Sequence, residues 1–151
     1  MTKETFTEMI TADEAMLYKV AMSMLKNDAD AQDAVQSAIL RAYERLGTLK
    51  REEYFRTWLI RILNNICSKQ RRMRKRTAEL TEIDMVSSSS DEEIEVRAAV
   101  EALPLKIRQV IILYYSDQLT TKEIGAVLRI PKGTVLSRLD KGRRLLRLDL
   151  E

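Results

Sequence analysis

Residues 120–147 read TTKEIGAVLRIPKGTVLSRLDKGRRLLR, and this stretch decides how the C-terminal part of the chain folds. Thr120 and Glu123, three residues apart, form a capping box, the signal that starts a helix. Pro131 ends this short helix because proline cannot continue a helix interior. A second helix is expected from Lys132 or Gly133 onward. Two helices joined by a tight turn predict a helix-turn-helix.

The helix expected after Pro131 has a buried side and a polar side. Its apolar residues, Val135, Leu139, Leu145 and Leu146, are spaced for burial. The other side gathers hydroxyl and basic groups, which contact phosphates and base edges in DNA. The candidate DNA-binding residues are Lys132, Thr134, Ser137, Arg138 and Lys141. A helical hairpin that binds no DNA is the alternative.

The composition limits the fold class. The chain has 151 residues, of which 45% are hydrophobic, with only four glycines and two prolines. These values favour one or two small helical domains over a fold rich in turns. No apolar run is long enough for a transmembrane helix, and the N-terminus lacks the pattern of a signal peptide. Cys67 is the only cysteine and forms no internal disulfide, so a cytoplasmic protein is expected.

Several chemistries are excluded by what the sequence lacks. There is no histidine, which removes Ser-His-Asp and Cys-His catalysis and every histidine-ligated metal site. No glycine-rich phosphate-binding loop is present. We therefore expect no enzyme activity, no metal and no cofactor.

Charge divides the chain into three parts. Residues 1–76 contain 15 basic and 10 acidic residues, residues 77–96 contain seven acidic and no basic ones, and residues 97–151 contain 11 basic and six acidic ones. Two basic modules therefore flank an acidic connector. This asymmetry favours an anionic partner such as nucleic acid.

Three helices are expected in the N-terminal module. The first begins at Thr11, with Glu14 completing a capping box. The second runs from about Asp30 to Leu46, where apolar residues repeat at helical spacing, and Gly47 is placed to cap its end. The third runs from about Thr57 to Arg76 and buries Trp58 rather than offering it for base stacking.

Two of these helices carry polar faces of interest. On the second, Asp33 and Gln36 lie on a face whose default interpretation is a solvated surface. The third carries basic and amide side chains and ends in KQRRMRKR at 69–76, where six cations repel one another unless phosphates relieve them. The candidates for contact with nucleic acid are Arg61, Asn64, Asn65, Lys69 and Arg72.

The remaining segments complete an all-α architecture. Residues 77–93 include VSSSSDEE and predict a flexible acidic linker. Asp91 is placed to cap a following helix, and Pro104 suits the first turn of the next one. Residues 105–116 are apolar on nearly all sides, as in a central core helix. The expected domains are 1–76 and 94–151, two small helical bundles joined by the linker.

These pieces resemble a known family. DADAQDAVQSAILRAYERL at 28–46 and FRTWLIRILNNICSKQRR at 55–72 look like region 2 of bacterial sigma factors. ALPLKIRQVIILYYSDQLTTKEIGAVLRIPKGTVLSRL at 102–139 looks like region 4. Only these two regions are present, which is the layout of the extracytoplasmic-function (ECF) group of the sigma-70 family.

The resemblance implies roles that periodicity does not show. The protein would join core RNA polymerase and direct it to promoters, with Asp33 and Gln36 docking on the clamp of the largest polymerase subunit. The loop at 47–55 and the helix after it would capture unpaired bases of the −10 element, and the residues lining that strand would be Arg61, Asn64, Asn65 and Lys69. Region 4 would contact the polymerase flap and place its last helix in the −35 major groove. An anti-sigma factor, membrane-bound in many members of the group, would be a further partner.

The sequence departs from the family in the helix-turn-helix. Arg129 stands where a turn glycine is usual, and a positive φ there would cost on the order of 1 kcal/mol. Leu136 and Asp140 replace residues of other chemistry; a leucine can meet a thymine methyl group and a carboxylate can accept from cytosine. Gly142 is expected to weaken its helix by roughly 1 kcal/mol relative to alanine.

Two other functions fit parts of the pattern. A helix-turn-helix repressor or activator would bind duplex DNA by itself, as a dimer on a palindrome. An adaptor that binds only protein is opposed by the basic run at 69–76 and the basic last helix. Sequence-selective transcription with core polymerase would separate the three possibilities.

Overall fold

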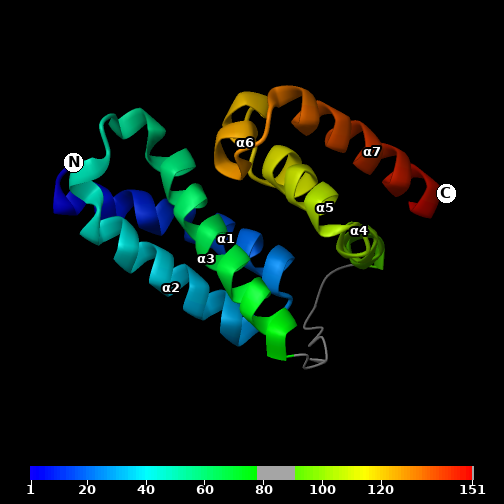
Figure 1. Cartoon of the computed structure of the whole chain (residues 1–151), viewed down its shortest axis with the longest axis horizontal. Coiled ribbons are helices and arrows are strands. Elements are labelled where there is room, and N and C mark those ends of the chain that lie inside the picture. Colours follow the sequence, from blue (N-terminus) through cyan, green and yellow to red (C-terminus); the bar gives the residue numbers. More distant parts are fainter. Residues whose placement is uncertain (78–90, 151) are drawn as a thin grey trace. The chain divides into compact units, whose positions relative to one another are not determined.

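A computed structural model describes the backbone over residues 1–77 and 91–150 and the side chains over 1–74 and 93–148. Every regular element within these ranges is helical, which confirms the expected all-α class (Figure 1). The chain divides into two compact units, Met1–Ile83 and Asp84–Glu151. The segment predicted as a flexible linker falls mostly outside the described residues.

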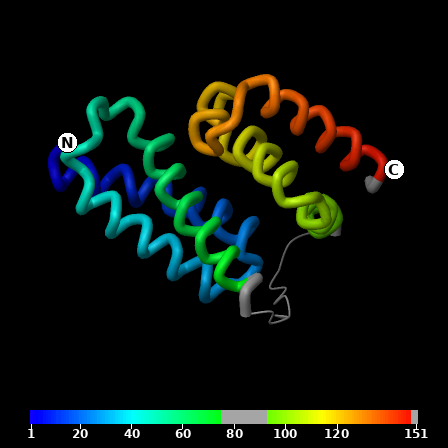
Figure 2. The backbone as a smooth tube through the Cα atoms, viewed as in Figure 1, coloured from blue at the N-terminus to red at the C-terminus, as the bar shows by residue number. Residues whose placement is uncertain are grey.

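The first unit is a bundle of three helices, α1 (Lys3–Leu25), α2 (Asp28–Glu44) and α3 (Phe55–Thr77). The three lie side by side and each packs on the other two, as the backbone trace shows (Figure 2). Alanines at every third or fourth position of α2 let the helices approach closely: Ala31, Ala34, Ala38 and Ala42 are all buried. The larger side chains that fill the core come from α1 and α3, among them Leu17, Met24, Phe55, Leu59 and Leu63.

The predicted start of the first helix was wrong. The helix begins at Lys3, where the Thr2 side chain accepts a hydrogen bond from the Thr5 N–H over 3.1 Å. Thr11 lies inside the helix, and its hydroxyl donates to the carbonyl oxygen of Thr7. A threonine followed by an acidic residue at the third position therefore gave a false capping signal here, because Phe6 and Ile10 continue the buried stripe upstream.

The predicted end of the second helix was also wrong. The C-cap is Arg45 with φ −103°, and Gly47 lies in the following 3₁₀ turn, Leu46–Thr48, with no positive φ. A second 3₁₀ turn, Glu52–Tyr54, leads directly into α3 at Phe55. Phe55 is fully buried and packs edge-on against Phe6 of α1, with ring centroids 5.7 Å apart. This contact fixes where α3 begins, two residues before the predicted Thr57.

The second unit contains α4 (Asp91–Glu101), α5 (Leu105–Ile111), a π-helical turn at Ile112–Ser116, α6 (Thr121–Leu128) and α7 (Lys132–Leu150). The predicted capping box is confirmed: the Thr120 N–H donates to Glu123 Oε1 and the Glu123 N–H donates to Thr120 Oγ1. Pro104 is the residue before the first turn of α5 rather than part of it. The helix predicted over 105–116 is continuous in path but widens into the π turn at its end.

The helix-turn-helix turn has demanding backbone geometry. Arg129 closes α6 in the left-handed region, with φ 59°, and Gln118 before α6 has φ 57°. These conformations favour glycine, so the strain expected at Arg129 is present. Gly125 serves a different purpose, since a Cβ there would lie 2.9 Å from the carbonyl oxygen of Ile130. Its missing side chain therefore allows the turn to fold back on α6.

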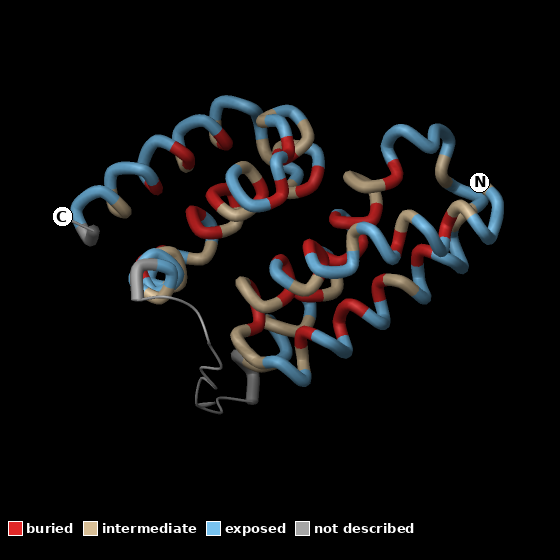
Figure 3. Tube along the Cα trace, turned by 180° about the vertical axis from the view of Figure 1, so that it is seen from behind, coloured by how far each residue is buried: buried red, intermediate tan, exposed pale blue. Residues whose placement is uncertain are grey.

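Gly142 was predicted to weaken α7, and the packing reverses that interpretation. A Cβ at this position would lie 2.7 Å from both Cγ1 and Cδ1 of Ile111 and 3.0 Å from Cγ2 of Ile107. Val135 and Leu139 are buried as well, and the buried positions of α7 recur along one side of the helix (Figure 3). The glycine thus lets α7 lie directly against α5, and alanine would overpack the contact.

The core of the first unit also contains the only cysteine of the chain, Cys67. Cys67 is buried, and burial raises the pKa of its thiol to about 12, so it stays protonated and unreactive at neutral pH.

Within the described ranges, none of the helices combines the length and apolar content that a membrane span requires.

A glycine-to-alanine pair tests the α5–α7 contact. Gly142→Ala should lower the free energy of unfolding by about 1–2 kcal/mol, because overpacking outweighs the gain in helix propensity. Gly133→Ala in the same helix should be neutral or stabilising, since nothing lies within 4 Å of a Cβ there. Urea denaturation of both variants measures the difference. Equal stability of the two would show that α7 does not need the glycine.

Candidate nucleic-acid and protein interfaces

The exposed side of α3 carries one continuous polar stripe. Arg61, Asn65, Lys69 and Arg72 are all exposed and follow one another at spacings of four, four and three residues. This is the spacing of one helix face. The opposite face is fixed in the core by Leu59, Ile60, Leu63 and Cys67. The stripe therefore points to solvent over about three turns and offers cations and an amide to an extended anionic ligand.

Asn64, the fifth residue predicted for this surface, lies on a different side of α3. It is half-buried, whereas its neighbour Asn65 is exposed. One residue of a helix is rotated by about 100° from the next, so the two amides cannot share a face. The sequence could not separate them because both flank the apolar stripe.

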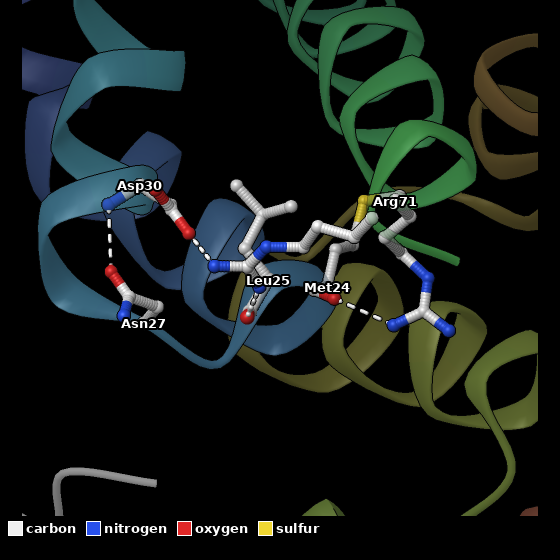
Figure 4. Close-up of polar contacts among 6 residues, drawn as sticks. Met24, Leu25, Asn27, Asp30 and Arg71 are labelled. Carbon is white, nitrogen blue, oxygen red and sulfur yellow. Dashed lines mark hydrogen bonds and ion pairs between the residues drawn. The ribbon is translucent and has the colours of Figure 1, made fainter. Parts of the chain in front are cut away.

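The part of the basic run whose side chains are described, residues 69–74, divides into two groups with different roles. Arg71 Nη1 donates to the carbonyl oxygen of Met24 over 2.8 Å, and Arg74 Nη1 donates to that of Leu25 over 2.9 Å. Arg74 also forms an ion pair with Asp30 at the start of α2 (Figure 4). Two guanidinium groups thus cap the C-terminus of α1, where unpaired carbonyls and the helix dipole favour cations.

The first turn of α2 completes this junction. The Asn27 side chain accepts from the Asp30 N–H over 2.9 Å, which caps α2 and places the Asp30 carboxylate for Arg74. The consequence for function is that Arg71 and Arg74 are engaged inside the bundle. Lys69 and Arg72 remain exposed and available.

The loop between α2 and α3 rests on an aromatic cluster. Phe6 packs edge-on against Tyr43 and Phe55, and Phe55 contacts Trp58 with ring centroids 5.9 Å apart. Trp58 was predicted to lie in the core, but it is only half-buried. The loop is therefore held at both ends by aromatic contacts.

The outward side of α7 is not quite the predicted one. Val135, Leu139 and Gly142 face the core, so the most exposed residues lie opposite them. Ser137 and Lys141 belong to this exposed side, as predicted, and Lys132 is exposed at the start of the helix. Thr134 and Arg138 are half-buried at its margin. Leu136 and Asp140, which the sequence analysis considered for contact with base edges, are exposed as well, and among the exposed residues that the prediction did not include are Arg143 and Arg144.

Two contacts restrict the cations of α7. Arg144 and Asp140 form an exposed ion pair with a separation of 3.4 Å. Arg143 Nε donates to the Tyr115 hydroxyl over 2.6 Å, and its guanidinium lies over the Tyr114 and Tyr115 rings at 5.8 and 5.6 Å from their centroids. Arg143 is thereby held against the π turn, which leaves Lys141 and Ser137 as the polar centre of the outward side.

The exposed face of α2 combines polar groups with one apolar side chain. Asp33 and Gln36 are both exposed, as predicted. Leu40 lies on the same face, one turn after Gln36 and two turns after Asp33, and is 60% exposed. An exposed apolar side chain within a polar rim is the arrangement found at protein interfaces. Leu40 stands opposite the buried stripe of α2, and an apolar residue on that otherwise polar face was a signal that the sequence prediction did not use.

Comparison with known proteins matches both units. Residues 9–77 match sigma-70 region 2, and residues 93–146 match sigma-70 region 4. The chain is 30% identical to the ECF RNA polymerase sigma factor SigW of Bacillus subtilis, with 98% of this chain and 90% of SigW covered. It is 28% identical to RNA polymerase sigma factor SigV of the same organism, over 99% of this chain and 93% of SigV.

A solved structure shares the fold. The sigma factor RpoE in complex with the anti-sigma factor NepR, from Bartonella quintana, matches with a TM-score of 0.85, 22% sequence identity and 97% coverage of both chains. At this identity the likeness concerns the fold alone. It agrees with the helical architecture described above.

A pair of arginine variants tests the division of the basic run. Arg74→Ala should lower the free energy of unfolding by about 1–2 kcal/mol, because it removes a helix cap and leaves Asp30 without its ion pair. Arg72→Ala should change it by less than about 0.5 kcal/mol, since the side chain is exposed. Thermal denaturation gives both values. Equal losses would contradict the assignment of Arg74 to the bundle.

Proposed function

The chain belongs to the extracytoplasmic-function group of the sigma-70 family, transcription initiation factors that bind core RNA polymerase and direct it to promoters, and we propose which of its surfaces perform each step. Polymerase docking and −10 recognition are assigned to residues 1–76, and −35 recognition to residues 94–151. The observation that carries this assignment is the continuous exposed stripe on α3, in a chain that also has a helix-turn-helix.

The proposed polymerase contact is the exposed face of α2. Asp33 and Gln36 supply hydrogen-bonding groups, and Leu40 supplies apolar area that the folded chain leaves in water. The packing of α2 does not depend on these side chains, since the helix is held through its buried alanines and Val35. A face that contributes little to stability and combines amide, carboxylate and apolar groups suits a protein partner.

The proposed −10 contact is the stripe of α3. Arg61, Lys69 and Arg72 neutralise phosphates along one strand, and Asn65 is able to bond to base edges or backbone oxygens. Binding unpaired bases in preference to paired ones stabilises the open strand. Strand opening would then draw on binding energy, with no nucleotide hydrolysis by this chain.

The proposed −35 contact is the outward side of α7. Ser137 and Lys141 lie at its centre, with Thr134 and Arg138 at one margin and Lys132 at the start of the helix. Leu136 and Asp140 face outward as well, so they are placed to influence which base pairs are accepted. Their chemistry differs from that usual in the family, which points to an unusual −35 sequence.

Regulation by an anti-sigma factor is the proposed control. Such a protein would act by covering the α2 face or the region 4 surfaces, which are exposed in each unit. The similar fold of RpoE was determined in complex with NepR, an anti-sigma factor. We propose a cytoplasmic location, where polymerase and promoter DNA are found.

Transcription with purified core polymerase tests the function as a whole. With a library of promoter sequences, the protein should select a subset and yield both promoter elements. By itself it should bind duplex DNA at best with micromolar affinity, because opening the −10 element costs a few kcal/mol per extruded base. Tight, sequence-specific duplex binding without polymerase would instead identify a repressor or activator.

A charge-reversal pair tests polymerase docking. The double variant Asp33→Arg, Gln36→Arg should lose co-purification with core polymerase and keep its melting temperature, because both side chains are exposed. Thr11→Arg, Glu14→Arg is a matched control, with the same spacing, the same change of charge and two exposed positions on α1. If the α2 variant binds polymerase normally, docking lies elsewhere.

A lysine pair tests the −35 contact. In the polymerase complex, Lys141→Ala should weaken promoter binding and reduce the slope of log K against log salt by about 0.9, the contribution of one phosphate contact. Lys106→Ala on α5 is the control, since its side chain is also exposed but lies outside the helix-turn-helix. An unchanged slope for Lys141→Ala would mean that this side of α7 does not face DNA.

A further inference from the structure

Asp140 and Arg144 form an ion pair on the outward side of α7. Arg144 Nη2 lies 3.4 Å from Asp140 Oδ2, and the side chains of Arg144 and Asp140 are 65% and 67% exposed. Asp140 stands two residues before Gly142, which packs on α5, and Arg144 stands two residues after it. Each residue of a helix is rotated by about 100° from the next, so both side chains point away from α5. The pair therefore lies on the surface proposed for −35 DNA.

A contribution to helix stability does not explain this pair. Ion pairs between exposed groups four residues apart add little to the free energy of unfolding, because water and salt screen them. Asp140 also stands on a side of α7 that otherwise gathers Lys141, Arg144 and Arg147, all of them exposed. Phosphates repel a carboxylate on a surface that binds DNA. An acidic group at this position is therefore accounted for by base recognition rather than by phosphate binding or packing.

The tyrosines of the π turn determine which arginine pairs with Asp140. The pKa of the Arg143 guanidinium is raised, first by its hydrogen bond with Tyr115 and to a smaller extent by neighbouring charges that include Asp140. The Tyr115 hydroxyl accepts from Arg143 Nε over 2.6 Å, and the guanidinium lies over the rings of Tyr114 and Tyr115. These contacts hold Arg143 against the π turn. Arg144 is the cation that meets the Asp140 carboxylate.

We propose that Asp140 and Arg144 act together to recognise one G·C base pair of the −35 element. The inference rests on the proposed function and names a base pair that this side of α7 accepts. Arg144 donates two hydrogen bonds to O6 and N7 of guanine, and Asp140 accepts one from N4 of the paired cytosine. The ion pair fixes the orientation of the guanidinium before DNA binds, so less side-chain entropy is lost on binding.

The chemistry of the pair matches the major-groove edge of G·C and not that of A·T. Guanine presents two acceptors and cytosine one donor. Adenine in place of guanine would turn an amino donor toward the guanidinium, and thymine in place of cytosine would leave the carboxylate without a donor. Leu136, one turn before Asp140, is 49% exposed and offers only apolar surface, so it does not compete for these hydrogen bonds.

The experiment measures promoter binding by the complex of the full chain with core polymerase, with each base pair of the −35 element varied in turn. For the wild type, changing one G·C pair to A·T should weaken binding by about 5- to 150-fold, the range for one bidentate contact. Arg144→Ala and Asp140→Ala should each reduce the preference at that same base pair and at no other. The double variant should lose no more of this preference than Arg144→Ala, because the two side chains act as a unit.

A modified base and a matched variant serve as controls. Replacing the guanine by 7-deazaguanine removes the N7 acceptor and keeps base pairing. This change should weaken binding by the wild type and leave binding by Arg144→Ala unaffected. Arg147→Ala removes another exposed arginine of α7 and should keep the preference at every base pair. The melting temperatures of all the variants should match that of the wild type, since the changed side chains are exposed.

Several outcomes would overturn the inference. One is an unchanged preference at every base pair in both single variants, and another is a uniform loss on all sequences, which would indicate a phosphate contact. A preference for A·T at the affected base pair, or effects of the two variants at different base pairs, would also exclude joint recognition of G·C. In these cases the proposed function stands as long as the wild-type complex selects a −35 sequence. A complex without any −35 preference would contradict the proposed function itself.

Discussion

The burial of one face of α3 is the constraint on which the rest of the first unit depends. Phe55, Leu59, Leu63 and Cys67 are all inaccessible to solvent, so the helix has only one rotation about its axis that satisfies the core. That rotation turns the polar stripe outward. The candidate nucleic-acid surface is therefore a consequence of core packing, and it needs no loop to position it.

Electrostatic interactions at the far end of α3 hold the bundle in this arrangement. Arg71 and Arg74 bond to the last carbonyl groups of α1, and Arg74 also pairs with Asp30 of α2. One helix thus joins the other two through charged hydrogen bonds as well as apolar contacts. The same run of cations serves structure on one side and offers Lys69 and Arg72 to a ligand on the other, since successive residues of a helix face different directions.

In the second unit, close approaches of the backbone position the helices, and the buried Arg108 donates to the carbonyl oxygens of Glu101 and Leu103. Gly142 allows α7 to lie against Ile107 and Ile111 of α5, and Gly125 allows the turn to fold back onto α6. Both positions accept no side chain without displacing a neighbour. In contrast, the turn residue Arg129 keeps a left-handed conformation without being glycine. The close approaches determine which side of α7 faces outward, and with it the residues that are able to meet DNA.

The sequence by itself determined the helical class, the capping box of α6, the helix-turn-helix and the exposed positions of Asp33, Gln36, Arg61 and Lys141. These features follow from hydrophobic periodicity and local hydrogen bonding, and both are determined within short segments of the chain. Tertiary structure alone decided the start of α1, the separation of Asn64 from Asn65, the inward bonds of Arg71 and Arg74, and the need for Gly142. Each of these depends on a partner from a distant part of the chain. A local sequence pattern shows which side of a helix is apolar. It does not show which distant segment of the chain packs against that side.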